Sequence, residues 1–115
     1  MAFTHVINGS VLTIRLHEDL DVSSRGSTLR RIEGLLHGYR PGRMVVEMAD
    51  SPIGPAALST VLRVERRCEE MGVSMVLVAS APEARRQLRP LAHLPLCATT
   101  AEAIRLTEDA GAIAA

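Results

Sequence analysis

The sequence predicts an α/β fold with a mixed, mostly parallel β-sheet and about four helices, in the order β-β-α-β-α-β-α-β-α. Two observations carry this prediction. Short apolar runs rich in β-branched residues alternate along the chain with segments whose apolar residues recur at helical spacing. A hairpin signal precedes the first helical segment and adds one antiparallel pair to the sheet. With 115 residues and no linker or internal repeat, the chain is expected to form one domain over residues 1–115.

The chain opens with a predicted β-hairpin. Runs of β-branched and aliphatic residues extend from Phe3 to Ile7 and from Val11 to Leu16. The dipeptide Asn8-Gly9 between them is typical of a type I′ turn, because both residues tolerate positive φ. We therefore expect two short antiparallel strands joined by a tight turn.

A first helix is expected from about Ser24 to His37. Its apolar residues recur at helical spacing, and charged residues occupy most of the other positions. Gly38 follows the last apolar residue, as a glycine in a left-handed C-cap does. The helix is therefore predicted to end there.

A buried strand and a second helix come next. The run from Met44 to Met48 is apolar apart from Glu47, which is typical of a strand covered on both faces. A helix is expected from Pro55 to Met71, because proline suits the first helical position and Gly54 can act as N-cap. Gly72 is expected to end this helix.

A further strand is expected from Val73 to Val78. Ser80 and Glu83 then have the spacing of a capping box, which predicts a third helix that ends near Pro90.

The last elements are a short strand and a fourth helix. The stretch from Leu94 to Ala98 is apolar and suits a short strand. Thr99 and Glu102 form a second capping-box pattern, so a helix is expected to begin there and to reach about Asp109. The residues from Gly111 onward are expected to fray.

The composition argues against several functions. Thirteen basic and thirteen acidic side chains give a formal net charge of zero, so a basic nucleic-acid surface is not expected. Aromatic residues make up 2% of the chain, which leaves no platform for base stacking. All the basic residues are arginine, so lysine chemistry is excluded. No signal peptide or membrane-length apolar stretch is present, so we expect a cytoplasmic protein that binds neither membranes nor nucleic acid.

No pattern of an enzyme, metal or cofactor site is present. The sequence has no glycine-rich phosphate loop, no zinc-ligand spacing and no nucleophile elbow. Cys68 and Cys97 lie in apolar surroundings and are expected to be buried thiols. We therefore expect a protein without enzymatic activity, metal or cofactor.

Three arginines cluster in the second predicted helix: Arg63, Arg66 and Arg67. They could bind phosphate or an acidic partner. A solvated helix face, with Glu69 and Glu70 nearby, explains the same pattern.

The segment from Asp50 to Ala57 is the best candidate for a functional loop. It follows a buried strand and leads into a helix, so it lies at the carboxyl edge of the sheet. Open α/β sheets usually place their binding sites at that edge. The small residues Ala56 and Ala57 would let a partner approach the backbone closely.

Three stretches of the sequence resemble STAS domains, the fold of bacterial anti-sigma-factor antagonists. Leu16 to Val22 resembles the family's Gly-x-Leu-Asp segment, and Arg43 to Met48 resembles its Val-Val-x-Asp-Leu strand. Ile53 to Ser59 stands where the family has Ile-Asp-Ser-Ser-Gly-Leu. The resemblance extends over about Val11 to Leu106.

The resemblance fails at the family's phosphorylation motif. The family's loop contains a serine that a partner kinase phosphorylates, but Pro55 and Ala56 stand at this phosphosite position and have no hydroxyl. Ser51 and Ser59 are the nearby hydroxyls, and neither matches the motif. Asp21 of the acidic loop is retained.

The resemblance implies a regulatory module that binds a protein partner. The implied partner is an anti-sigma factor with a histidine-kinase-like ATPase domain, in a bacterial partner-switching pathway, and a homodimer is left open. Without the serine, the module would be unswitched or diverged, and Ala56→Asp should weaken docking. The implied docking surface comprises Asp19, Asp21, Ser51, Gly54, Pro55, Ala56, Ala57 and Arg63.

An alternative function is left open. STAS-like domains can also bind small molecules, so the chain could be a small-ligand or nucleotide-sensing module. The absence of lysine and of a glycine-rich loop argues against phosphate binding, whereas the arginine cluster leaves it open.

Overall fold

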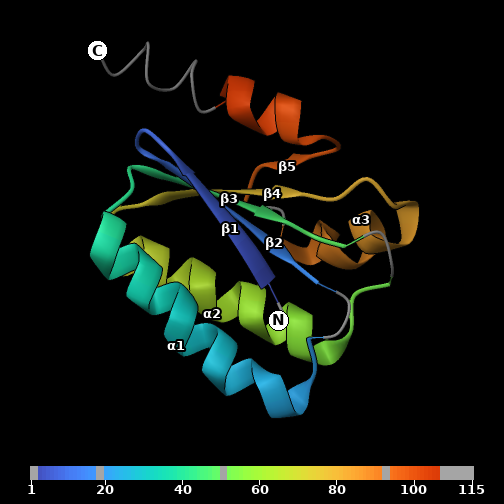
Figure 1. Ribbon diagram of the computed structural model, residues 1–115. Coiled ribbons are helices and arrows are strands. Elements are labelled where there is room, and N and C mark those ends of the chain that lie inside the picture. The colour runs from blue at the N-terminus through green and yellow to red at the C-terminus, as the bar shows by residue number, and fades with distance from the viewer. Residues whose placement is uncertain (1–2, 18–19, 50–51, 92–93, 107–115) are drawn as a thin grey trace.

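The computed structural model describes residues 3–17, 20–49, 52–91 and 94–106. Its centre is a five-stranded sheet in which the strands lie side by side in chain order (Figure 1). The first two strands pair antiparallel, and each later strand pairs parallel to the one before it. This agrees with the predicted mixed α/β class. The strands are β1 (Phe3–Asn8), β2 (Val11–Leu16), β3 (Arg43–Glu47), β4 (Ser74–Val78) and β5 (Leu96–Cys97).

Helices cover the two faces of the sheet unequally. The first face carries α1 (Val22–Tyr39), α2 (Pro55–Met71) and α3 (Pro82–Leu88), which leads into a 3₁₀ turn, η1 (Arg89–Leu91). A short helix at 100–106 lies on the second face (Figure 1). The parallel strands are therefore connected by helices that pack on the sheet, as parallel pairing requires.

The period of two along each strand sends alternate side chains to the two faces. On β2, Leu12, Ile14 and Leu16 are buried in the larger core beneath α1 and α2. Val45 and Val76, on the two strands that follow, are buried in the smaller core instead. The central strands thus contribute to both cores, which explains their almost continuous apolar sequences.

The hairpin forms as predicted, but its turn is of another type. Asn8 pairs with Val11, so the two turn residues are Gly9 and Ser10. Of these, Gly9 alone has positive φ, at +61°. A type I′ turn needs positive φ at both central residues, whereas type II′ needs it at the first. The predicted type I′ turn centred on Asn8-Gly9 is therefore wrong, and glycine is required at the first turn position.

Helix α1 extends beyond both predicted ends. Asp21 caps its first turn, so the helix begins at Val22 rather than at Ser24. At the other end Gly38 is helical, and Arg40 is the left-handed C-cap with φ +47°. Arg40 donates its backbone N–H to the carbonyl oxygen of Leu36. The predicted cap at Gly38 is wrong.

Both ends of α2 agree with the sequence. Gly54 is the N-cap and Pro55 occupies the first turn. Gly72 is the left-handed C-cap with φ +71°, and its N–H donates to the carbonyl oxygens of Cys68 and Glu69. Proline at the start and glycine at the end thus set the limits of this helix.

The predicted capping box at Ser80 is wrong. Helix α3 begins at Pro82, its N-cap is Ala81, and no side chain caps it. In the helix at 100–106, Thr99 Oγ1 accepts from the N–H of Glu102, as predicted. The Glu102 carboxylate reaches one residue further back and accepts from the N–H of Ala98. The predicted extension to Asp109 lies outside the described residues.

Candidate docking surface

The loop before α2 lies at the carboxyl edge of the sheet, where β3 ends. Ile53 is buried in this loop. The side-chain amide of Gln87 on α3 forms hydrogen bonds with both the N–H and the carbonyl oxygen of Ile53. Ile53 N–H donates to Gln87 Oε1 at 2.7 Å, and Gln87 Nε2 donates to the Ile53 carbonyl oxygen at 2.8 Å. This pair of bonds imitates the pairing between neighbouring strands. It fixes the loop against a helix far along the chain.

The first residues of α2 differ in accessibility. Gly54 and Pro55 are exposed, Ala57 is half-buried, and Ala56 is only 5% exposed. The side chain of Ala56 therefore faces the protein interior and is unavailable to a partner. This corrects the sequence interpretation, which placed Ala56 on the docking surface and used Ala56→Asp as its test.

Asp21 lies at the same edge of the sheet, at the start of α1. Its carboxylate accepts from Ser23 Oγ and from the N–H of Ser24. Ser24 Oγ in turn lies within hydrogen-bond distance of the Asp21 N–H, which completes a capping box. The bonds from Ser23 and Ser24 lower the pKa of Asp21, because they favour the charged form. Asp21 thus has a structural role and is also exposed.

Of the remaining predicted surface residues, the structure describes only Arg63. Asp19 and Ser51 lie outside the described residues. Arg63 is exposed on α2, about two turns beyond Pro55. Ser59 is half-buried, and Arg25 Nη1 of α1 donates to its Oγ at 3.3 Å.

A small open hollow adjoins the loop. Its volume is about 160 Å³, and most of its walls are apolar. It lies between the ends of β2 and β3 and the start of α2. The lining residues are Leu16, His17, Leu20, Met48, Ala49, Pro52, Ile53, Gly54 and Ala57.

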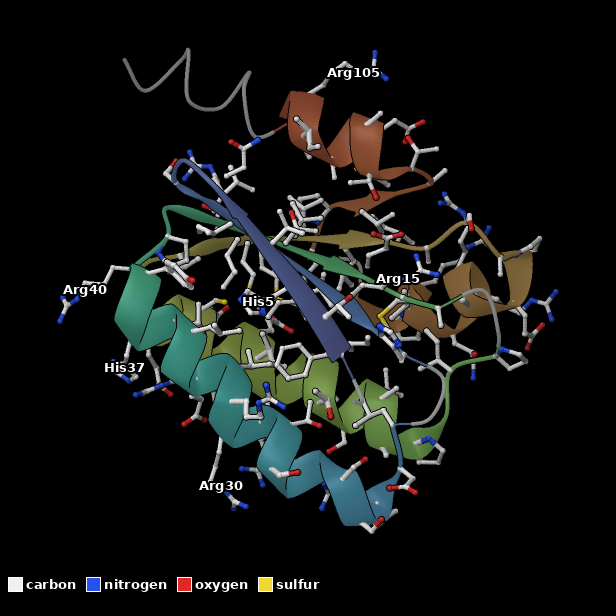
Figure 2. All side chains as sticks on the ribbon, viewed as in Figure 1. His5, Arg15, Arg30, His37, Arg40 and Arg105 are labelled. Atoms are coloured by element: carbon white, nitrogen blue, oxygen red, sulfur yellow. The ribbon has the colours of Figure 1, made fainter. Side chains whose placement is uncertain are left out.

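The arginine cluster of α2 does not converge on one point. Arg67 donates to Glu70 at 2.8 Å and lies 2.9 Å from Nε2 of His37 on α1. It therefore links the two helices, while Arg63 and Arg66 are exposed. Figure 2 shows that His37 itself projects outward from α1. The arrangement favours the interpretation as a solvated helix face.

The thiols and acidic groups do not assemble into a reactive site in the described part of the chain. Burial raises the pKa of the Cys68 thiol to about 11, so it is protonated at neutral pH. Cys97 was expected to be buried, but the structure shows it half-buried. Its partial burial raises the pKa of its thiol as well. Within residues 3–17, 20–49, 52–91 and 94–106, no three His, Cys, Asp or Glu side chains are grouped to hold a metal ion. None of the helices there is long and apolar enough to cross a membrane.

Gln87 is the functional candidate that sequence reasoning missed. It sits in a short arginine-rich helix, and nothing in its neighbours marks it. Its bonds to Ile53 join residues 34 positions apart. Only a contact between distant segments reveals its role.

No family model and no curated protein matches this chain. Several solved structures share its fold, including the following two. The protein TM1081, solved by NMR, superposes with a TM-score of 0.73 at 16% identity, over 91% of this chain and 87% of that one. The anti-sigma factor antagonist SpoIIAA, in its unphosphorylated form, superposes with a TM-score of 0.72 at 20% identity, over 94% of this chain and 97% of that one. The resemblance to the STAS fold is confirmed at the level of the fold.

Proposed function

We propose that this chain is a non-enzymatic regulatory module of the STAS type that acts by binding a protein partner. The observation that carries the proposal is the fold shared with an anti-sigma factor antagonist over 94% of this chain and 97% of the other. The proposed partner is an anti-sigma factor with a histidine-kinase-like ATPase domain. Fold alone does not specify function, so the proposal also rests on the geometry of the docking surface.

The proposed docking surface consists of Gly54, Pro55, the exposed face of α2 that includes Arg63, and the acidic segment around Asp21. These residues are exposed, and the loop is held rigidly by Gln87. A rigid loop loses little conformational entropy when a partner binds. Asp19 and Ser51 remain in the proposal as sequence neighbours of this surface.

We further propose that docking is not controlled by phosphorylation at the start of α2. Pro55 and Ala56 stand at the phosphosite position of the family and have no hydroxyl group. A phosphate there would add nearly two negative charges to the surface, which would repel an acidic partner and would cost desolvation energy against an apolar one. Without an acceptor, the surface would stay competent to bind.

A charge at Pro55 tests the docking surface. An aspartate at the first position of a helix favours the helix dipole, so Pro55→Asp should fold normally. Capture from lysate of the native host should recover an ATPase partner with the wild-type chain and with Pro55→Ala, but not with Pro55→Asp. Ser74→Asp is the matched control, because Ser74 is exposed at the opposite edge of the sheet. It should capture the partner normally.

Two results would contradict the proposal. Equal capture by Pro55→Asp and by the wild type would exclude the start of α2 from the interface. Phosphate on Ser51 or Ser59 in the captured chain would show that the chain is phosphorylated at another position near the start of α2. Ala56→Asp is unsuitable here, because it would bury a charge and destabilise the fold whether or not a partner docks.

A further inference from the structure

The second face of the sheet is only partly covered. The helix at 100–106 packs over the central strands, where Ala103 is buried against Val45, Val76 and Val78. The hairpin has no helix on that face within the described residues. Val6 on β1 is consequently 64% exposed, and Ile104 on the helix is 40% exposed.

A cavity lies between the hairpin and this helix. Its volume is about 510 Å³, which is within the range of small-molecule sites. Strands β1, β2 and β3, the hairpin turn and the helix all contribute to its walls. The lining residues are Val6, Asn8, Ser10, Val11, Thr13, Glu47, Thr100 and Ile104.

The lining combines an apolar wall with a few polar groups. Three aliphatic side chains face three hydroxyl groups and one amide, the pattern by which small-molecule sites hold and orient a ligand. Glu47 is the single charged side chain in the lining. It is also the one charged residue in the apolar run from Met44 to Met48.

Glu47 gives the cavity a negative charge at its base. Its side chain is 25% exposed and accepts a hydrogen bond from Arg15 on the neighbouring strand. Arg15 does not line the cavity, and neither does any other cation. Figure 2 shows the cation of the helix, Arg105, projecting away from the sheet. Among the described residues, the cavity lining therefore contains a carboxylate and no cation, while Arg15 pairs with that carboxylate from outside the lining.

We propose that this cavity binds a small amphipathic molecule with an ammonium head group. Its apolar body lies against Val6, Val11 and Ile104, and its ammonium donates to the Glu47 carboxylate. Partial burial strengthens this attraction over that of an exposed pair. The same charge repels phosphates and carboxylates, so nucleotides are not its ligands. The site lies on the face of the sheet opposite to α2 and does not depend on the proposed docking function.

A pair of ligands of similar size tests the charge preference. Tryptamine and indole-3-propionate carry the same ring and differ in their charged ends. NMR titration of the ¹⁵N-labelled protein should give saturable shifts at the amides of Val11, Thr13 and Ile104 with tryptamine. The affinity for the propionate should be at least about tenfold lower than that for tryptamine.

Variants of the ion pair separate the proposal from unspecific binding. Glu47→Gln should abolish the preference for tryptamine, and Arg15→Gln should strengthen tryptamine binding, because it removes the competing cation. Arg15→Gln also keeps the test valid if Glu47→Gln fails to fold. Ile104→Trp narrows the cavity and should weaken both ligands. Glu83→Gln, an acidic side chain on α3 paired with Arg86, is the matched control and should change nothing.

Three outcomes would overturn the proposal. One is the absence of localised shifts at a tryptamine concentration of about 10 mM. Another is equal affinity of the wild type for the two ligands. The third is a preference for tryptamine that survives Glu47→Gln, since the carboxylate would then have no part in recognition.

Discussion

At the scale of single residues, Asp21 shows how one side chain can have both a local role and an accessible charge. It caps α1 through Ser23 and Ser24 and is nevertheless exposed. An N-cap satisfies a backbone donor that the helix itself leaves unpaired. A variant at Asp21 that weakens partner capture therefore needs a stability control before the loss is assigned to docking.

We predict that the contribution of Asp21 to stability depends on pH. Its pKa is lowered in the folded protein, so its carboxylate stabilises the fold fully above its ordinary pKa and loses that effect as the pH falls through the lowered value. Asp21→Ala should lower the urea midpoint at pH 7, and the difference from the wild type should shrink on acidification.

Asp21→Asn serves as the control for this pH effect. Asparagine keeps an oxygen acceptor and is an equally good N-cap, so this variant should lose little stability at any pH. A difference between Asp21→Ala and the wild type that stays constant down to about pH 2 would refute the assignment.

At the scale of elements, Gln87 joins α3 to the loop in front of α2. We predict that Gln87→Ala costs about 1–3 kcal/mol, because two hydrogen bonds are lost and the backbone of Ile53 loses its partners. Hydrogen exchange at the Ile53 amide should accelerate selectively. In Gln87→Glu, exchange at the Ile53 amide should be slower than in Gln87→Ala, because glutamate keeps the side-chain acceptor and loses only the donor. Unchanged exchange in Gln87→Ala would show that the loop is held by other contacts.

Two glycines at helix ends should respond in opposite directions. Gly72 has positive φ, so Gly72→Ala should cost about 1 kcal/mol. Gly38 is helical and an added Cβ would meet open space, so Gly38→Ala should stabilise the protein by up to about 1 kcal/mol. Urea unfolding measures both. A loss of stability in Gly38→Ala would place the left-handed cap there after all, as the sequence pattern predicts.

At the scale of the whole molecule, the two cores share their strands. Strands β3 and β4 send alternate residues to the larger core and to the cluster beneath the helix at 100–106. Neither core can lose its packing without disturbing the strands of the other. Helices on both faces should therefore unfold together.

We predict that Val76→Ala lowers the free energy of unfolding by about 1–3 kcal/mol, as the loss of two buried methyl groups does in other cores. Helix α1 lies on the opposite face, yet its amide signals should be lost at the same urea concentration as the far-UV circular dichroism signal. Different midpoints for the two probes would mean that the faces unfold independently.

Local patterns were enough to predict most of the elements. The apolar periods located the strands and helices, and Pro55 with Gly72 set both limits of α2. These signals succeed because they act within a few residues: proline constrains its own φ, and glycine permits a left-handed cap. The predictions failed where neighbouring residues compete for one role. Gly38 and Arg40 could both end α1, and the structure places the left-handed cap at Arg40.

The alternation of strands and helices, the hairpin and the absence of a hydroxyl at the start of α2 all follow from the amino-acid sequence. Each of these depends on a residue type and its near neighbours. The tertiary structure alone decided that Ala56 is buried while Pro55 is exposed, that Gln87 holds Ile53, and that Glu47 opens onto a cavity. Those facts depend on contacts between segments that are distant along the chain. They arise when the helices settle on the two faces of the sheet, which no local pattern encodes.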